Sequence, residues 1–405
     1  MSFVTSNIRG ACPTLATPMQ TGDGLLARII SNEPIAVEKL CALCDASETY
    51  GNGIIEVTQR GSLQIRGLTA TSASGFADIV TSLGIGADNS PPLLTSPLLG
   101  LDAGEPFDST PLLPHLRAAI QRNRSDFQGL GAKVSVLVDG GGNLHLDAVP
   151  ADIRVEATSN YLFKLSLAGD AHSASFVGYV SMNRVVASVE DLLRLIAGWG
   201  PTARARDLVA GLRLGRAPAI TRPASDPIAA YPLKDGTYAC GLALPFGHTT
   251  APALKRLAQS AERHGARAIR PAPGRALLAI GLALASAEIL RESAASQGFV
   301  VDANDPRRHV IACAGTPACA SARLATREWA PEVARAARSL EGTSHVVHLS
   351  GCSKGCAHPG PAAVTIVGPD RVVVNGRAGD TPRATVSSDG LIADIERLCG
   401  KIRHG

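Results

Sequence analysis

Apolar and polar positions along this chain follow one order of predicted elements twice. In the first stretch a strand begins at 23–28, an apolar stripe over 37–44 predicts a helix, and alternation over 53–68 predicts two strands. Much later the same order returns, with the strand, the helix and the strand pair at 235–240, 251–264 and 268–282. Each stretch therefore predicts a β-α-β-β module of the ferredoxin-like kind.

A second kind of segment follows each module. After the first module, a predicted helix near 111–122 leads to an apolar strand over 133–138, which ends at the glycines 140–142. After the second module, a predicted helix over 320–340 leads to an apolar strand over 345–349, which ends in a loop with two cysteines. The chain is thus predicted to be an internal duplication, in which the glycine turn takes the place of the cysteine loop.

The predicted fold class is α+β, with two ferredoxin-like β-α-β-β modules that alternate with two α/β modules. A chain of 405 residues is long enough for several domains with cores of their own. The stretch 216–232, rich in proline and alanine, is the predicted linker between the two copies. The expected domain bounds are, in chain order, 16–75, 90–215, 232–295 and 305–400, the last of which carries the paired cysteines.

Charge and hydropathy exclude several classes of protein. With 39 basic and 35 acidic side chains the net charge is +4, the basic residues are dispersed, and 4% of residues are aromatic, so no nucleic-acid partner is expected. No apolar run approaches the length of a membrane helix, and residues 1–23 lack the pattern of a secretory signal. We therefore expect a cytoplasmic protein that is not anchored to a membrane.

Four of the nine cysteines form two close pairs, Cys313-x5-Cys319 and Cys352-x3-Cys356. Thiolate sulfur suits iron, and four thiolates on two loops can bind the four iron atoms of a [4Fe-4S] cluster. Structural zinc favours about two to four residues between paired cysteines, which argues against zinc, and an odd number of cysteines without an export signal argues against disulfides. The other five are expected to be small buried side chains, which are Cys12, Cys41, Cys44, Cys240 and Cys399.

The duplicated plan with these two cysteine pairs resembles the sulfite and nitrite reductase superfamily over almost the whole chain. Within that superfamily, two stretches resemble the precorrin-3B synthases of the aerobic cobalamin pathway. They are Ser350 to Pro359 (SGCSKGCAHP) and Thr58 to Arg66 (TQRGSLQIR).

The resemblance implies a monooxygenase that hydroxylates precorrin-3A at C20 with O2 and closes a γ-lactone. It implies a [4Fe-4S] cluster on the four paired cysteines and a mononuclear non-haem iron whose ligands the sequence does not identify. It also implies an external reductant such as NADH. In the sequence, Gly84-Ile85-Gly86 lacks the third glycine of a dinucleotide-binding turn, so a separate reductase or ferredoxin is expected to deliver the electrons. Internal duplication already supplies a two-sided cleft, so a monomer is expected.

A substrate with several carboxylates requires arginine and lysine, since a guanidinium can grip a carboxylate through two parallel hydrogen bonds. Any one of the basic residues can instead be a solvated charge at a strand end, whereas the set together favours a cationic pocket. By matching positions in the family, the substrate-binding candidates are Arg60, Arg66, Lys133, Arg270, Arg275 and Lys354.

Among the histidines, His358 is the catalytic candidate because it lies two positions after Cys356. His345 and His348 are interpreted as structural. Non-haem iron often takes two histidines and a carboxylate, and the nearest such pattern is His145-x-Asp147.

Two other functions stay open. One is a siroheme-dependent sulfite or nitrite reductase, in which Cys356 would bridge the cluster to the haem iron. The other is a cluster protein without catalytic activity, such as an electron carrier. Siroheme would give intense visible bands, whereas a cluster alone gives a broad shoulder. An absorbance spectrum therefore separates the siroheme-dependent reductase from the oxygenase that the resemblance implies.

Overall fold

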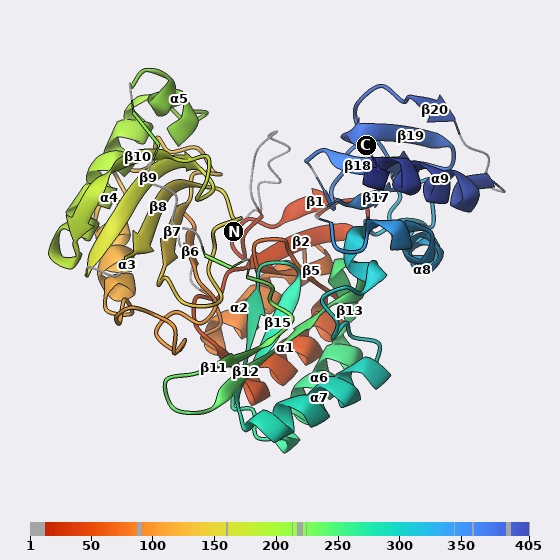
Figure 1. Ribbon diagram of the computed structural model, residues 1–405, viewed down its shortest axis with the longest axis horizontal. Coiled ribbons are helices and arrows are strands. Elements are labelled where there is room, and N and C mark those ends of the chain that lie inside the picture. The colour runs from red at the N-terminus through yellow and green to blue at the C-terminus, as the bar shows by residue number, and fades with distance from the viewer. Residues whose placement is uncertain are drawn as a thin grey trace.

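The protein forms four five-stranded sheets in the part of the chain that the computed structural model describes. That part comprises residues 13–86, 91–158, 161–212, 214–216, 222–223, 225–343, 345–358, 360–385 and 390–404. Figure 1 shows two sheets with their helices in the lower centre and one α/β module on either side of them. The predicted fold class is confirmed, while the bounds expected for the four domains stay a prediction.

The first ferredoxin-like sheet has the strand order β1-β2-β5-β4-β13. Its strands are β1 (Met19–Thr21), β2 (Gly24–Ile29), β5 (Leu63–Leu68), β4 (Ile54–Val57) and β13 (His248–Thr250). The second sheet has the order β11-β12-β15-β14-β3. Its strands are β11 (Ala230–Pro232), β12 (Tyr238–Ala243), β15 (Ala276–Leu282), β14 (Ala268–Ala272) and β3 (Ile35–Ala36).

The two ferredoxin-like modules exchange strands. β3 directly precedes α1 (Val37–Tyr50) yet pairs with β14, and β13 directly precedes α6 (Ala251–Arg263) yet pairs with β4. One apolar core therefore contains residues of both modules, and it is completed by α2 (Ser72–Ser82) and α7 (Leu284–Ser296). Since neither sheet is complete without the other module, the two modules form one structural unit.

The two α/β sheets share one strand order, in which three parallel strands are followed by two antiparallel ones. The first contains β6 (Leu93–Thr95), β7 (Val136–Asp139), β8 (Ala151–Ala157), β9 (Leu162–Gly169) and β10 (Ser175–Ser181), with α3 (Leu112–Arg122), α4 (Met182–Gly198) and α5 (Ala205–Ala210). The second contains β16 (Val310–Ala312), β17 (Val347–Ser350), β18 (Ala362–Val367), β19 (Arg371–Gly376) and β20 (Ala384–Thr385), with α8 (Thr326–Ala336) and α9 (Leu391–His404). Short 3-10 helices lie at η1 (Pro245–Gly247), η2 (Pro306–His309) and η3 (Ala337–Leu340).

The internal duplication is therefore visible in the topology. The loop after β7 contains the glycines 140–142, and the loop after β17 contains the second cysteine pair, at the same place in each sheet. In parallel sheets the carboxyl ends of the strands share one edge, where sites are usually built. No helix among the described residues is long and apolar enough to cross a membrane.

One predicted helix has different bounds in the structure. We expected it over 320–340, but α8 begins at Thr326 and is followed by η3. The residues before it form turns because their backbone donors bond to other loops: the Ala320 N–H donates to the Gly22 carbonyl at 3.0 Å and the Arg323 N–H to the Gly351 carbonyl at 2.8 Å. The helix thus begins several residues after Cys319 rather than beside it.

Candidate functional site

The two cysteine pairs lie on loops that follow two adjacent parallel strands. Cys313 comes directly after β16, and Cys352 comes two residues after the end of β17. The loops are joined by backbone contacts, because the Cys313 N–H donates to the Leu349 carbonyl at 3.1 Å and the Gly351 N–H donates to the Cys313 Sγ at 3.1 Å. A backbone donor aimed at sulfur favours the thiolate form, which is the form that binds iron.

The other cysteines of the two pairs lie near this junction. Cys356 is exposed as a whole residue, but its thiol is partly enclosed by protein. This burial raises the pKa of the thiol, and the neighbouring Cys352 and Cys313 raise it further. Cys319 faces the first ferredoxin-like module, since a side chain on Gly22 would collide with its sulfur. Glycine at this turn therefore lets β1 and β2 approach the cysteine loop closely.

No three His, Cys, Asp or Glu side chains of the described residues lie close enough to hold a single metal ion. A [4Fe-4S] cluster asks for a different arrangement, because each of its four thiolates binds a different iron atom and the sulfurs stand apart around the cube. The two loops, with their glycines and thiols, fit that kind of cofactor. The described residues do not offer a ligand set for a separate mononuclear iron.

A network of charged side chains joins the cysteine-bearing module to the first sheet. Arg66 on β5 donates to Asp23 at 2.7 and 2.6 Å and to Glu56 at 3.3 Å. Arg327, in the first turn of α8, forms an ion pair with the other oxygen of Glu56 at 3.2 Å. Burial opposes the charge on Arg66, but Glu56 and Asp23 outweigh it and raise the pKa of this arginine. Burial instead lowers the pKa of Arg327, against the opposing effect of Glu56.

This network lies on one face of the first sheet. Gln64 pairs across the strands with Arg28 and with Glu56, and Glu56 pairs with His248, so these side chains form a row across β2, β5, β4 and β13. Residues that are directly paired across strands share a face of the sheet. The opposite face, with Ile55 and the other apolar positions, packs into the core.

The basic residues predicted to bind substrate fall in different places. Arg66 lies by the cysteine loops, but the carboxylates of Asp23 and Glu56 already occupy its guanidinium. Lys354 is exposed on the second cysteine loop, with its Nζ 3.4 Å from the Ser321 hydroxyl. The turn that contains Arg60 meets the turn between β14 and β15, where Arg60 pairs with Pro273 in an isolated bridge.

Two other predicted positions lie away from the cysteine loops. Arg270 is buried on β14 and donates to the Asn32 carbonyl at 2.6 Å and the Thr95 hydroxyl at 2.7 Å, and burial lowers its pKa to about 10. Lys133, which we expected on a strand, is exposed in a turn closed by the Val134 N–H and the Gly131 carbonyl. β7 begins only at Val136, so Lys133 lies at the end of that strand opposite the triple glycine.

Arg275, His348 and His358 come together beside the second cysteine loop. His348 is fully buried on β17, and its ring contacts that of His358 edge to face, with 5.7 Å between the centroids. Burial, then His358 and Arg275, lower the pKa of His348 to about 3, and burial and Arg275 also lower that of His358. The His358 Nε2 lies 3.1 Å from the Pro361 carbonyl, which can only accept, so this nitrogen carries the proton.

The sequence analysis missed Asp23, Glu56 and Arg327. The signal for Glu56 was weak: it is a single acidic residue in the strand Ile54–Val57. Of the other cysteines, Cys44, Cys240 and Cys399 are buried as expected, Cys41 is partly buried on α1, and Cys12 lies outside the described residues. His345 is exposed, and its carbonyl bonds to the His309 ring at 3.0 Å.

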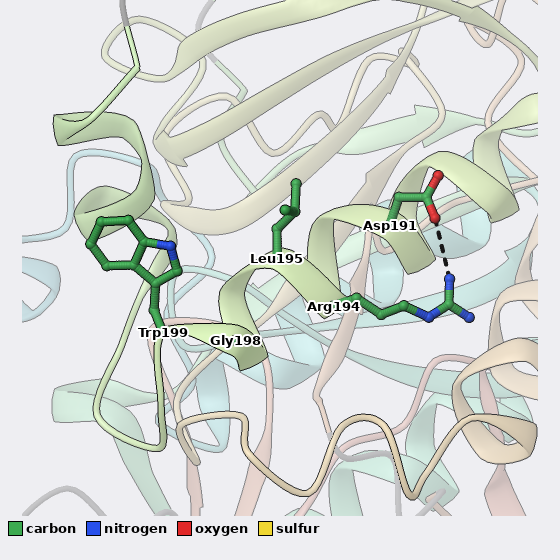
Figure 2. A pocket seen from close by; sticks show the side chains of 5 residues that line it. All are labelled: Asp191, Arg194, Leu195, Gly198 and Trp199. Atoms are coloured by element: carbon green, nitrogen blue, oxygen red, sulfur yellow. Dashed lines mark hydrogen bonds and ion pairs between the residues drawn. The ribbon is translucent and has the colours of Figure 1, made fainter.

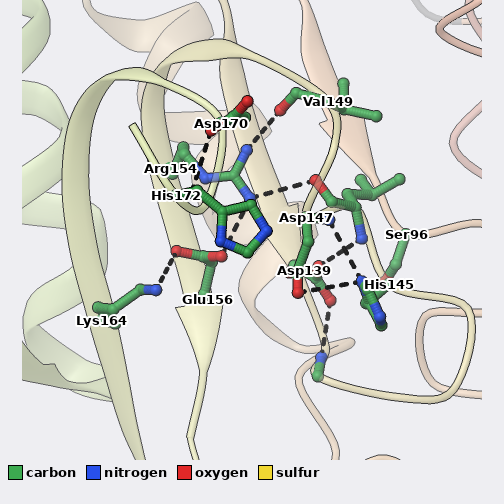
Figure 3. A network of polar contacts seen from close by, with 12 residues as sticks. Ser96, Asp139, His145, Asp147, Val149, Arg154, Glu156, Lys164, Asp170 and His172 are labelled. Carbon is green, nitrogen blue, oxygen red and sulfur yellow. Dashed lines mark hydrogen bonds and ion pairs between the residues drawn. The ribbon is translucent and has the colours of Figure 1, made fainter. Parts of the chain in front are cut away.

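The loop after β7 holds a charged cluster instead of cysteines. Asp139 is fully buried, and its carboxylate accepts from the Gly141 and Leu146 N–H groups at 2.8 and 2.7 Å. Figure 3 shows His145 and Asp147 facing each other in this cluster, with 3.3 Å between Nδ1 and Oδ2. Arg222 is also paired with Asp147. A guanidinium cation thus stands where the His145-x-Asp147 pattern suggested iron, and the arrangement is that of a structural ion-pair cluster.

Replacing His145 with glutamine is expected to destabilise the protein more at pH 6 than at pH 9. Burial opposes protonation, but Asp147 and the Pro223 carbonyl outweigh it and raise the pKa of His145. The stabilisation of the folded protein by the His145 ion pair is therefore complete below about pH 6.5, the pKa of histidine in the unfolded chain. It is lost as the pH rises through the higher pKa of His145 in the folded protein. Thermal unfolding of both proteins across this range measures the effect, and an equal loss at both pH values would contradict the ion pair.

A shallow hollow on α4 lies elsewhere on the first α/β module. Figure 2 shows that its lining comes from one helix end, with the side chains of Asp191, Arg194, Leu195 and Trp199 around Gly198. Its only charged groups form a surface ion pair of 3.2 Å between Asp191 and Arg194. A hollow this open, without converging polar groups, lacks the features of a catalytic site.

Comparisons with known proteins agree with this geometry. Residues 19–83 match the family model of the nitrite/sulfite reductase ferredoxin-like half domain. The solved structure of the Mycobacterium tuberculosis NirA protein superposes with a TM-score of 0.71 at 19% identity, covering 92% of this chain and 80% of that one. A ferredoxin–nitrite reductase of Synechococcus elongatus is 24% identical over 82% of this chain and 73% of its own length. The fold is therefore that of the nitrite and sulfite reductases.

A nearer similarity places the chain within that superfamily. A precorrin-3B synthase of Sinorhizobium sp is 39% identical over 99% of this chain and 90% of its own length. The chain belongs to the precorrin-3B synthase family, and the resemblance seen in the sequence is confirmed.

Proposed function

We propose that this protein is an iron-sulfur oxygenase that converts precorrin-3A into precorrin-3B, with hydroxylation at C20 and closure of a γ-lactone. One atom of O2 enters the substrate and the other leaves as water, which consumes two electrons and two protons. The observation that carries the proposal is the meeting of the two cysteine loops with the charged face of the first sheet, in a chain of this family.

In this proposal Cys313, Cys319, Cys352 and Cys356 hold a [4Fe-4S] cluster. When bound, such a cluster supplies electrons one at a time. The chain contributes the thiolates, the Gly351 N–H that donates to Cys313, and the positive charges of Arg66 and Arg327 nearby. These donors and charges stabilise a negatively charged group at the loops. We assign no step to a mononuclear iron, because the described residues offer no ligand set for it.

His358 is the candidate for moving a proton. Since its Nε2 carries the hydrogen that bonds to the Pro361 carbonyl, its Nδ1 presents a lone pair. Burial and Arg275 lower the pKa of this imidazole, which favours its neutral form, the form that can accept a proton. Arg60, Arg275 and Lys354 are the candidate partners of the substrate carboxylates, while Arg66 positions the charged face. A separate protein would supply the electrons.

A siroheme-dependent nitrite or sulfite reductase is the second candidate, because the Synechococcus elongatus relative is a ferredoxin–nitrite reductase. The greater identity to a precorrin-3B synthase makes it the second choice. In that case the same loops would hold the cluster, and a haem would lie over the charged face.

The absorbance spectrum of the anaerobically purified protein, with iron and acid-labile sulfide counted on the same sample, tests the proposal. We expect a broad shoulder without haem bands, and conversion of precorrin-3A only with both O2 and a reductant. Intense siroheme bands, together with nitrite or sulfite reduction, would transfer the assignment to the second candidate. A protein that binds neither iron nor tetrapyrrole would overturn both.

A further inference from the structure

His348 is a buried polar side chain without a partner. It is 0% exposed, and neither ring nitrogen forms a hydrogen bond among the described residues. It points away from the core that Val347 and Leu349 form with α8 and α9, because successive strand residues face opposite sides of a sheet. On that side it contacts the second cysteine loop, where a side chain on Gly355 would lie 3.7 Å from its ring. A buried imidazole with two unpaired nitrogens is costly unless a bound group supplies the missing partner.

Arg275 is a cation aimed at the same place. As a residue it is partly buried, its guanidinium is enclosed by protein, and its side chain forms no hydrogen bond or ion pair within the described part of the chain. The carboxylate that acts on its charge belongs to Glu56, which Arg66 and Arg327 already share. An enclosed charge of this kind requires an anion that the protein does not provide.

The backbone is shaped to hold Arg275 in this position. Its φ of +63° lies in the left-handed region, which is unfavourable for residues other than glycine. Gly247 leaves room for it, because a side chain there would lie 2.5 Å from the Arg275 Cδ. Both features cost stability and are understandable if the guanidinium serves a ligand.

The first copy of the duplication provides an internal comparison. Gly61 is the counterpart of Arg275. Gly61 lies two residues before Leu63 of β5, Arg275 lies two residues before Leu277 of β15, and the φ of Gly61 is +78°. Leu137 takes the place of His348 as the second residue of the middle parallel strand, and it packs in an apolar cluster. The first copy thus has a glycine and a leucine at the two positions where the second copy has Arg275 and His348, whose side chains have no hydrogen-bond partner among the described residues.

We infer that Arg275 and His348 form a binding site for one carboxylate of the substrate macrocycle. This inference rests on the proposed function and adds to it a residue that the sequence led us to interpret as structural. The Arg275 fork donates two hydrogen bonds to the carboxylate and one His348 N–H donates a third. The carboxylate then lies against the Gly355 to His358 segment, which places the attached ring beside the second cysteine loop.

The test replaces each residue by its counterpart in the first copy, as Arg275→Gly and His348→Leu. The probe is uroporphyrin III, a tetrapyrrole with eight carboxylates, titrated by absorbance and fluorescence against the purified protein. We expect each variant to bind about tenfold or more weakly, since a hydrogen bond to a charged group is lost, and to melt at the same or a higher temperature than the wild type. Arg335→Ala, which removes an exposed arginine of α8, is the matched control and is expected to bind like the wild type.

Lower melting temperatures with unchanged binding in both variants would overturn the inference and make the two residues structural. Failure of the wild type to bind uroporphyrin III would also overturn it. Conversion of precorrin-3A by the same wild-type preparation decides the proposed function separately. If the wild type converts precorrin-3A and both variants bind the probe normally, only the carboxylate site is lost.

Discussion

Replacing Cys356 with serine is expected to leave a folded protein that lacks cluster iron and sulfide. The hydroxyl of serine does not provide the thiolate that iron prefers, and three remaining cysteines cannot cap all four corners of a [4Fe-4S] cube. If the proposed function holds, we expect the broad absorbance shoulder to disappear and the proposed oxygenase activity to fall by more than about 100-fold, beyond the effect of changing a residue that only supports a metal ligand. Iron and sulfide analysis and low-temperature electron paramagnetic resonance measure the result.

Cys41→Ser is the matched control for this experiment. Cys41 is partly buried on α1, outside the two cysteine loops, so replacing it removes none of the four proposed cluster ligands. This variant should keep the iron and sulfide content of the wild type. A Cys356→Ser protein with a complete cluster would show that another residue is the fourth ligand.

The duplication was predictable from the sequence because strand and helix periodicities are local properties. Alternation over 53–68 corresponds to β4 and β5, and the apolar stripe over 37–44 to α1, which continues six residues further to Tyr50. The strand exchange between the modules was not predictable, since β3 contains only Ile35 and Ala36 and its partner β14 is far away in the sequence. The start of α8 was wrong for a related reason: backbone contacts with distant loops, not local propensity, set it.

The site divides in the same way. Cysteine spacing is local, and the cysteine loops lie where the pattern indicated. Asp23 is 43 residues from Arg66, and Glu56 is 10 residues from Arg66 and 271 from Arg327, so no helix or strand spacing marks these pairs. The Arg66 pairs form only when the strands of the first module meet in one sheet, and the Arg327 pair forms only when the cysteine-bearing module packs against that sheet.

The expected symmetry of the basic residues also fails for a physical reason. Gln64 and Arg66 lie on the charged face of the first sheet, but Leu278 and Ile280 take their places in the second. That second face is apolar and packs against Leu98 and other residues of the first α/β module. One copy thus uses its sheet face for charge and the other for packing, so only the first can line a polar site.

Replacing Glu156 with glutamine is expected to give the largest loss of stability among changes outside the cysteine loops. Glu156 is 1% exposed on β8, and its two oxygens form ion pairs of 3.0 Å with Arg154 and 3.0 Å with Lys164, as Figure 3 shows. Both cations are buried as well, so the variant leaves two charges without their carboxylate. Removing one partner of a buried ion pair costs about 3–5 kcal/mol. Arg154 keeps the Val149 and Leu146 carbonyls, whereas Lys164 loses the carboxylate with which it pairs in the described part of the chain.

Asp191→Asn is the matched control, because Asp191 belongs to the same module but its ion pair with Arg194 is exposed, and such pairs are worth about 0–1 kcal/mol. Thermal unfolding followed by circular dichroism, together with hydrogen exchange of β8 and β9, measures both variants. We expect a large loss for Glu156→Gln and almost none for Asp191→Asn. Adding Lys164→Met to Glu156→Gln should restore part of the stability, since it removes the charge left unpaired. Two results would contradict this explanation: Glu156→Gln is as stable as Asp191→Asn, or the double variant is less stable than Glu156→Gln alone. Either would show that Glu156 does not stabilise the protein by neutralising buried charge.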